Sequence, residues 1–518
     1  MSTELTKKAG FIAVGTTISR ILGYFRDMLV AHTFGAGIAA DAFYAAYRIP
    51  NLLRRLLGEG SLSASFIPVL SDYLHNKTKE ETQELISVVF TALTIVMAIL
   101  TILGIIFSDK LVYVIAYGFT NDPEKLALTV SLTRWMFPFV FFICLAASLL
   151  GVLNTLSAFF VPAVAPASLS IAEIGFIMGI APALSPNNQI KGLAMSVIVG
   201  GIGQFMVQWP KIRSLGWHLR WKIKFNHSGL RQIGTLMIPS MIGLSVDQIN
   251  AFVDTMAGSF LELGSITALY YSNRIMQLPL AIFGLALASV ALPAMSRAAA
   301  EKNMAALKET LNFSVRFIIF ILLPSSVGLM VLGMPIVHVL FERGNFSHHA
   351  AFMTNSALFF YSLGLPAYAI AKVMASAFYS QKETKVPVKV AASAMILNII
   401  LIVILMPYLK VGGLALATAL ASYFNFSVLA WVLRKRIGPL GIRRIMQTTA
   451  KTMLAAAVMG ILSYFIAYRW LATHPLVGMA TALVAGILAF FGAAYLLKLE
   501  ELTPLFSIIF KDKPTGED

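Results

Sequence analysis

Charged side chains interrupt an apolar stretch near the N-terminus. From Arg20 to Asp27 the chain reads R-I-L-G-Y-F-R-D, and its neighbours on both sides suit the interior of a lipid bilayer. A charged side chain at the bilayer centre costs on the order of 3 kcal/mol, so such groups usually face a bundle interior or a wet cavity. On a helix, Arg20 and Asp27 share one face because they are seven residues apart, and Arg26 points about a third of a turn away.

The next apolar stretch carries a polar stripe. Asp41, Arg48 and Arg55 recur every seven residues and therefore lie on one face of a helix over residues 38–60, with Arg54 beside them. This stripe predicts that the second helix also faces polar surroundings.

A hinge is predicted towards the end of the same helix. Pro50 removes a backbone hydrogen bond, and Gly58 and Gly60 flank Glu59 in the sequence G-E-G. Proline and glycine are the usual causes of helix bending. We therefore expect Gly58, Glu59 and Gly60 to act as a hinge or gate.

The charges inside apolar segments do not cancel one another. The surplus of arginine over acid predicts an anionic ligand, because the planar guanidinium binds phosphate or carboxylate through two parallel hydrogen bonds. The alternative for a single residue is a structural pair, such as Arg20 with Asp27. The arginines are Arg20, Arg26, Arg48, Arg54, Arg55 and Arg274, and the acids are Asp27, Asp41 and Glu59.

Three further charges in apolar segments have different interpretations. Arg134 and Glu173 are expected to pair with each other in a structural role. Asp254 stands alone in its segment, where an acid can bind a cation or a proton. Asn398 and Thr418 would add the oxygen ligands that Na⁺ requires, and the alternative for Asp254 is a buried acid held by hydrogen bonds.

Membrane-spanning helices must position these residues. The 518 residues are 58% hydrophobic and 12% charged, whereas soluble proteins carry about 25% charged residues. The single cysteine, Cys144, is expected to be a buried core residue. We expect an all-α integral membrane protein with about 14 spans of roughly 20 residues or more. These lie near 9–34, 38–60, 83–108, 127–152, 157–182, 190–210, 233–261, 266–295, 311–333, 351–379, 387–408, 411–433, 446–468 and 475–497.

The distribution of basic residues predicts the orientation of the chain. When the connections between spans are numbered alternately, about 24 lysines and arginines fall on one side and about 6 on the other. The positive-inside rule then places both termini in the cytoplasm. The net charge of +16 is thus explained by topology and anionic lipid headgroups rather than by nucleic acid.

No enzymatic motif is found. The sequence has no nucleophile elbow, no Gly-rich phosphate loop and no histidine spacing typical of a metal site. We therefore expect a transporter rather than an enzyme, with Na⁺ as the one candidate cofactor.

Three motifs recur at an offset of about 225 residues and predict an internal duplication. Residues 1–225 and 226–445 would each form a lobe of six spans, related by a pseudo-two-fold axis along the membrane normal. Transporters built in this way bind substrate near the midplane between the halves and alternate access by rocking. Residues 446–518 would add two further helices and a short tail. The matched pairs are Pro68 with Pro293, Pro162 with Pro387 and Arg48 with Arg274.

Several motifs closely resemble the MurJ (MviN) family of lipid II flippases, in the multidrug/oligosaccharidyl-lipid/polysaccharide exporter superfamily. They are S-R-I-L-G-Y-F-R-D, F-G-A-G-I-A-A-D-A-F, P-N-L-L-R-R-L-L-G-E-G and F-I-P-V-L-S in the first half, and Y-Y-S-N-R-I-M-Q-L-P and F-Y-S-Q-K-E-T-K-V-P-V-K in the second. The resemblance implies fourteen helices, a cationic cavity between two lobes and a groove for a prenyl tail at the last two helices. It also implies that Arg20, Arg26, Asp27, Asp41, Arg54, Arg55 and Arg274 are functional cavity charges and that Gly58-Glu59-Gly60 is a gate.

The resemblance implies the cargo and its location. The cargo would be lipid II, an undecaprenyl diphosphate that carries a disaccharide-pentapeptide, moved from the inner to the outer leaflet of the bacterial cytoplasmic (inner) membrane. Cell-wall synthesis proteins would be further partners. The alternative is another exporter of the superfamily, which moves a different prenyl-linked glycan or a drug coupled to Na⁺ or H⁺.

The sequence departs from the family at two positions. Asn273 and Gln277 flank Arg274 where some relatives have acids, which implies a more positive cavity. A family cation site maps to Asp254, Asn398 and Thr418, but Ile402 takes the place of a further acidic ligand.

Overall fold

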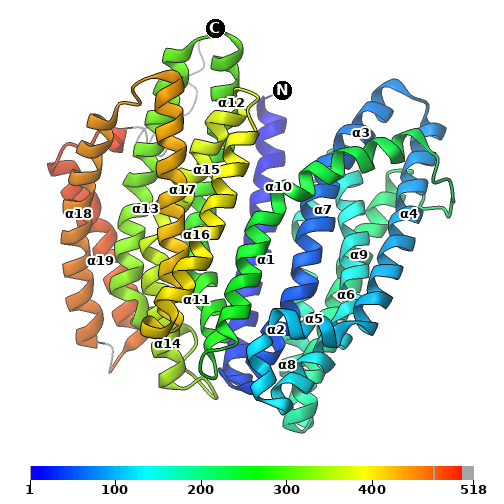
Figure 1. Cartoon of the computed structure of the whole chain (residues 1–518), viewed down its shortest axis with the longest axis horizontal. Coiled ribbons are helices and arrows are strands. Elements are labelled where there is room, and N and C mark those ends of the chain that lie inside the picture. The colour runs from blue at the N-terminus through cyan, green and yellow to red at the C-terminus, as the bar shows by residue number, and fades with distance from the viewer. Residues whose placement is uncertain (1, 471–472, 504–518) are drawn as a thin grey trace. The chain divides into compact units, whose positions relative to one another are not determined.

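The computed structural model describes residues 2–470 and 473–503, which contain helices and no strand (Figure 1). The side chains of residues 2–13, 59, 242–244 and 246–247 lie outside the description. The predicted all-α class is confirmed.

Most of the predicted spans fall on helices that could cross a membrane. Within the described residues, ten helices are long and apolar enough to do so, and an eleventh span is a pair bent by 41°, α14 (His348–Leu363) with α15 (Leu365–Tyr379). The other predicted spans, 9–34, 38–60 and 233–261, are helical as well. The number of fourteen crossings stays a prediction.

The chain forms two compact units. Unit 1 comprises Met1–Thr267 with Arg343–Ser347, and unit 2 comprises Ala268–Glu342 with His348–Asp518. α10 (Ser228–Gly258) thus belongs to unit 1, although the sequence repeat assigns residue 226 onwards to the second lobe. The division into residues 1–225, 226–445 and 446–518 stays a prediction from the repeat.

Unit 1 is built around α6 (Pro123–Thr155). In the most apolar part of α6, 78% of the residues are buried, more than in any other span of the described chain. Asp122 begins this helix by accepting a hydrogen bond from the Lys125 backbone N–H at 3.1 Å, and Pro123 suits its first turn. The other helices of unit 1 are α1 (Ser2–Phe34), α2 (Ile38–Leu53), α3 (Ser63–Asn76), α4 (Lys79–Ile106), α5 (Ser108–Ile115), α7 (Phe160–Val164), α8 (Ala167–Gly179), α9 (Pro186–Ser214) and the short turns η2 (Tyr117–Asn121) and η3 (Ala181–Ala183).

The predicted hinge lies in a π-helix. η1 (Arg54–Leu62) joins α2 to α3 without a break, so Pro50 does not end the helix. π-Helical segments are rare and often occur at functional sites. A second one, η4 (Leu280–Leu285), joins α11 (Ser265–Pro279) to α12 (Ala286–Ala300) and begins 226 residues after η1. The recurrence at the offset of the sequence motifs supports an internal duplication.

Unit 2 is built around α13 (Met304–Leu340). α18 (Ile442–Trp470) and α19 (Pro475–Leu496) lie side by side and pack against α13 (Figure 1). Phe320 of α13 meets Phe490 of α19 with ring centroids 5.4 Å apart. Arg316 pairs with Glu500 at 2.8 Å and Glu501 at 3.3 Å, which fixes the segment after α19 to α13. The remaining helices are α16 (Lys385–Leu409) and α17 (Val411–Ile437).

Candidate functional site

Arg26 is held by two acids inside unit 1. Its Nε and Nη2 donate to Asp27 Oδ1 at 3.0 and 2.7 Å, and its Nη1 lies 3.6 Å from Glu173 Oε1 on α8. All three residues are buried. The predicted pair of Arg134 with Glu173 is therefore wrong, because Glu173 belongs to the Arg26 network. Arg134 instead donates from Nε to Ser108 Oγ at 2.8 Å.

Arg20 has surroundings different from those of Arg26. It is exposed, and it makes no hydrogen bond or ion pair with the part of the chain that the structure describes. The predicted alternative of an Arg20–Asp27 pair is wrong, since Asp27 binds its sequence neighbour Arg26. On α1, one guanidinium is thus neutralised locally and the other faces outward without an acid.

Asp41 is the centre of a buried network. Its Oδ2 lies 2.9 Å from Lys125 Nζ and accepts the Gly264 N–H at 2.8 Å. Its Oδ1 accepts the Thr267 N–H at 3.0 Å and the Thr267 hydroxyl at 2.7 Å. Lys125 Nζ also lies 4.1 Å from the Phe119 ring centroid. Asp41 therefore neutralises a buried lysine and binds free N–H groups where α11 begins.

The arginines of the predicted stripe have different surroundings from those of Asp41. Arg48 is half-buried and donates from Nε to Thr255 Oγ1 of α10 at 2.9 Å. Arg54 donates from Nε to Asn51 Oδ1 at 3.1 Å, one turn back. Arg55 is exposed on the π-helix. The seven-residue spacing identified the polar face, but one helix face meets several different neighbours along its length.

The hinge motif has one tightly surrounded glycine. Gly58 is buried, and a Cβ placed on it would lie 3.4 Å from Ala147 Cβ and 3.5 Å from Cys144 Sγ. The predicted burial of Cys144 is confirmed. Gly60 is half-buried, and the side chain of Glu59 lies outside the described residues.

Arg274 is the predicted cavity charge of unit 2. It is half-buried on α11, and the neighbouring Gln277 donates a hydrogen bond to Asn273. Both of these neighbours are neutral, and a more positive cavity at this position stays a prediction.

The predicted sodium ligands fall in different units. In unit 2, Asn398 is buried and its Oδ1 accepts the Thr418 hydroxyl at 3.5 Å. Asp254 belongs to unit 1, where its Oδ1 is buried without a hydrogen-bond partner among the described residues and Arg48 acts on it electrostatically. In that part of the chain no cluster of three or more His, Cys, Asp or Glu residues could hold a metal. Sodium binding stays a prediction.

Sequence reasoning missed the partners of the two buried acids. Lys125 and Thr267 bind Asp41, and Glu173 binds Arg26. The available signal was energetic: a lone acid in an apolar helix needs a cation or several N–H donors. Sequence spacing within one helix cannot select that partner on another.

Comparisons with known proteins identify the family. The model of the family described as "Lipid II flippase MurJ" matches residues 30–485. A probable lipid II flippase MurJ of Vibrio cholerae is 34% identical over 511 residues, which cover 95% of this chain and 97% of the relative. The Burkholderia cenocepacia lipid II flippase MurJ is 32% identical and covers 93% and 94% of the two chains.

Solved structures agree with this assignment. The structure "Lipid II flippase MurJ, inward closed conformation" has a TM-score of 0.78 and 28% identity, and the match covers 97% of this chain and 99% of that one. An inward-facing multidrug transporter of the MATE family shares the fold, with a TM-score of 0.65 at 14% identity over 83% of this chain and 98% of the other. The chain therefore belongs to the MurJ family.

Proposed function

We propose that this protein is a lipid II flippase that carries the undecaprenyl diphosphate-linked precursor from the inner to the outer leaflet by alternating access. The names of the family model and of the curated relatives support this cargo. The transport class also agrees with the membrane-spanning helices.

The observation that carries the proposal is the charge arrangement on α1. Arg20 is exposed on a helix of a membrane protein and has no acidic partner in the described chain. Acids of the first two helices and of α8 already hold other cations: Asp27 and Glu173 hold Arg26, and Asp41 holds Lys125. A diphosphate would supply the negative charge that the protein does not provide at Arg20.

The further cationic members of the site have supporting roles. In unit 1, Arg48, Arg54 and Arg55 add positive charge along α2 and η1. In unit 2, Arg274 adds positive charge on α11. The π-helix at Gly58-Glu59-Gly60 supports a gate at this position, because a π-helix leaves the backbone less regular than an α-helix.

The last two helices suit a lipid tail. α18 and α19 expose large apolar side chains, among them Leu454, Phe465 and Leu488 at 60%, 67% and 67%. Their inner faces pack on α13. These exposed faces would form the groove for the prenyl tail while the headgroup is held among the arginines.

The proposed location is the bacterial cytoplasmic (inner) membrane, with both termini in the cytoplasm. In this orientation a membrane potential that is negative inside favours outward movement of an anionic headgroup, by about 2.3 kcal/mol per charge per 100 mV. Cell-wall synthesis proteins would then receive the lipid at the outer face. Coupling to Na⁺ through Asp254, Asn398 and Thr418 is a further part of the proposal.

Depletion of the protein in cells tests the function. An added enzyme that cleaves lipid II and cannot cross the membrane measures the lipid at the outer face. We expect lipid II to accumulate uncleaved on the inner leaflet after depletion, and the plasmid-borne gene should restore cleavage. Unchanged cleavage after complete depletion, in cells without another flippase, would overturn the proposal.

A further inference from the structure

A groove on the surface of α6 differs from the candidate transport site. It has a volume of about 720 Å³ and is lined by one face of the helix between Pro123 and Trp135. We propose that it binds the headgroup of an anionic phospholipid from the surrounding bilayer.

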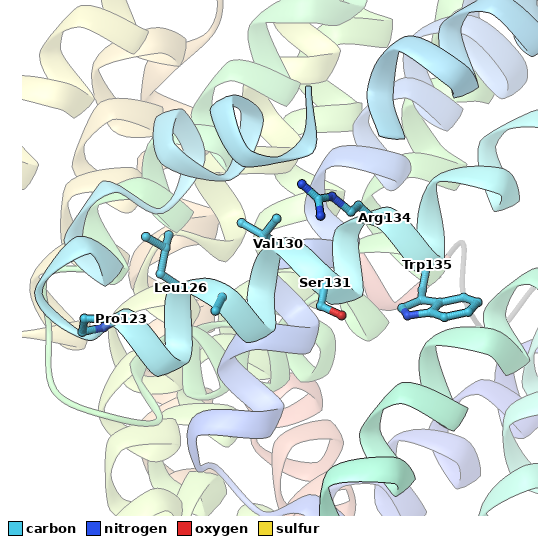
Figure 2. Close-up of a pocket in the computed structure, with 7 residues that line it drawn as sticks. Pro123, Leu126, Val130, Ser131, Arg134 and Trp135 are labelled. Atoms are coloured by element: carbon cyan, nitrogen blue, oxygen red, sulfur yellow. The ribbon is translucent and has the colours of Figure 1, made fainter. Parts of the chain in front are cut away.

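The lining side chains form two rows along α6. Leu126, Val130 and Arg134 form one row, and Ser131 and Trp135 form a second row about 100° around the helix (Figure 2). Residues four apart on a helix lie one above another, which explains both rows. The lining of the groove is therefore mostly apolar, with one cationic group, Arg134, at the end nearer the middle of α6.

Arg134 is oriented by α5 and is not neutralised there. Its Nε donates to the hydroxyl of Ser108 at 2.8 Å, and Ser108 is fully buried. No carboxylate in the described part of the chain lies within ion-pair distance of Arg134, and Arg134 is exposed. Since a guanidinium has five N–H donors, the two terminal amino groups keep the fork that binds a phosphate.

Arg134 lies in the first half of α6, towards one end of this long helix. α6 has 33 residues, so it is about 50 Å long and exceeds the hydrocarbon thickness of about 30 Å. On a helix centred in the bilayer, the backbone of Arg134 would lie roughly 7 Å inside the hydrocarbon edge, and its long side chain would extend towards the phosphates. The adjacent Trp135 is exposed by 44% and is of the residue type enriched at this interface.

The charge of the groove selects among lipids. An arginine without a carboxylate partner costs free energy at this depth, and a phosphodiester offsets that cost. Phosphatidylglycerol brings a net negative charge, whereas phosphatidylcholine brings its own cation. The groove therefore favours the anionic lipid.

Quenching of Trp135 by brominated lipids tests this site. The full chain would be placed in phosphatidylcholine vesicles with rising fractions of brominated phosphatidylglycerol or brominated phosphatidylcholine. The difference between the wild type and Trp135→Phe isolates the signal of Trp135. We expect half-maximal quenching at roughly fivefold lower fractions of the anionic lipid, the change that about 1 kcal/mol produces.

Variants separate a specific site from general contact with lipid. Arg134→Gln should abolish the preference, and Arg134→Lys should keep part of it because the charge remains without the fork. Lys191→Gln is the matched control, since Lys191 is an exposed cation near the start of α9 and outside the groove. Lys191→Gln should keep the full preference. Equal quenching by both lipids in the wild type, an unchanged preference in folded Arg134→Gln, or an equal loss in Lys191→Gln would overturn the site. The assay contains no lipid II, so its outcome is independent of the proposed transport.

Discussion

Arg26 on α1 and Glu173 on α8 form an ion pair, with Nη1 and Oε1 3.6 Å apart, and Asp27 completes the neutralisation of the same guanidinium. Among the described residues of unit 1, only one of the two arginines in R-I-L-G-Y-F-R-D thus has acidic partners. Arg26 fixes α1 to α8, and Arg20 remains exposed for a ligand. We therefore expect Arg26 to hold the fold together and Arg20 to contact the cargo.

Arg26→Ala should destabilise the protein. The substitution leaves Asp27 and Glu173 buried without their cation, and breaking such a network costs about 3 kcal/mol. Glu173→Gln should cost about 1 kcal/mol, because Asp27 still balances the arginine. Unfolding in detergent measures both. An Arg26→Ala protein with wild-type stability and lost transport would instead make Arg26 a pure cargo contact.

Asp41→Asn should leave Lys125 without a counter-charge. Lys125 is only 6% exposed, so we expect the free energy of unfolding to fall by about 3 kcal/mol. Thr267→Val removes one hydroxyl bond and should cost about 1 kcal/mol. The double variant Asp41→Asn with Lys125→Met should regain part of the loss, since neither charge remains. Additive losses in the double variant would contradict the pairing.

The surroundings of Glu342, in the connection between α13 and α14, predict that the stability of the protein depends on pH. Burial raises the pKa of Glu342, but hydrogen bonds from His338 and His348, each 2.8 Å long, outweigh it and hold the pKa below its ordinary value of 4.5. A lowered carboxyl pKa contributes stability above pH 4.5, which is lost as the pH falls through the folded-state pKa. Glu342→Gln should therefore destabilise the protein by about 1 kcal/mol at pH 7.

The difference in the free energy of unfolding between Glu342→Gln and the wild type should become smaller below pH 4.5. Thermal unfolding in detergent at pH 7, 5 and 3.5 measures it. Glu309→Gln is the matched control, because Glu309 is an exposed acid without a hydrogen bond or ion pair to the described chain. If the difference in stability between the variant and the wild type is the same at all three pH values, the charge of Glu342 does not stabilise the connection.

Gly58→Ala tests the hinge. A Cβ at Gly58 meets its neighbours at ordinary contact distance, so folding should be retained. Alanine makes the backbone less flexible than glycine does. If this raises the free-energy cost of bending the helix by about 1 kcal/mol, transport should slow roughly fivefold. Gly175→Ala on α8 is the control, since α8 is outside the proposed hinge and tail groove and no atom beyond the helix's own backbone and chain neighbours lies within 4 Å of its added Cβ. Unchanged transport by Gly58→Ala would remove Gly58 from the hinge.

Sequence patterns predicted the elements better than the contacts between them. Apolar length located the helices, and seven-residue spacing located the polar faces, since both depend on neighbours along one helix. The partners of Arg26 and Asp41 lie on other helices, and no local period encodes them. Composition predicts a proline and glycine hinge where the structure has a π-helix, Arg54–Leu62, because the shift in backbone hydrogen bonds leaves no mark in composition.

The most direct measurement is the rate at which lipid II crosses vesicles that contain the purified full chain. A fluorescent lipid II becomes accessible to a reductant that cannot cross the bilayer. The wild type should speed this crossing above protein-free vesicles. Arg20→Ala, equally stable, should slow it about tenfold, as expected for the loss of one charged contact worth about 1.5 kcal/mol. No acceleration by folded wild-type protein would contradict lipid II transport, and equal rates for Arg20→Ala would contradict the role of Arg20.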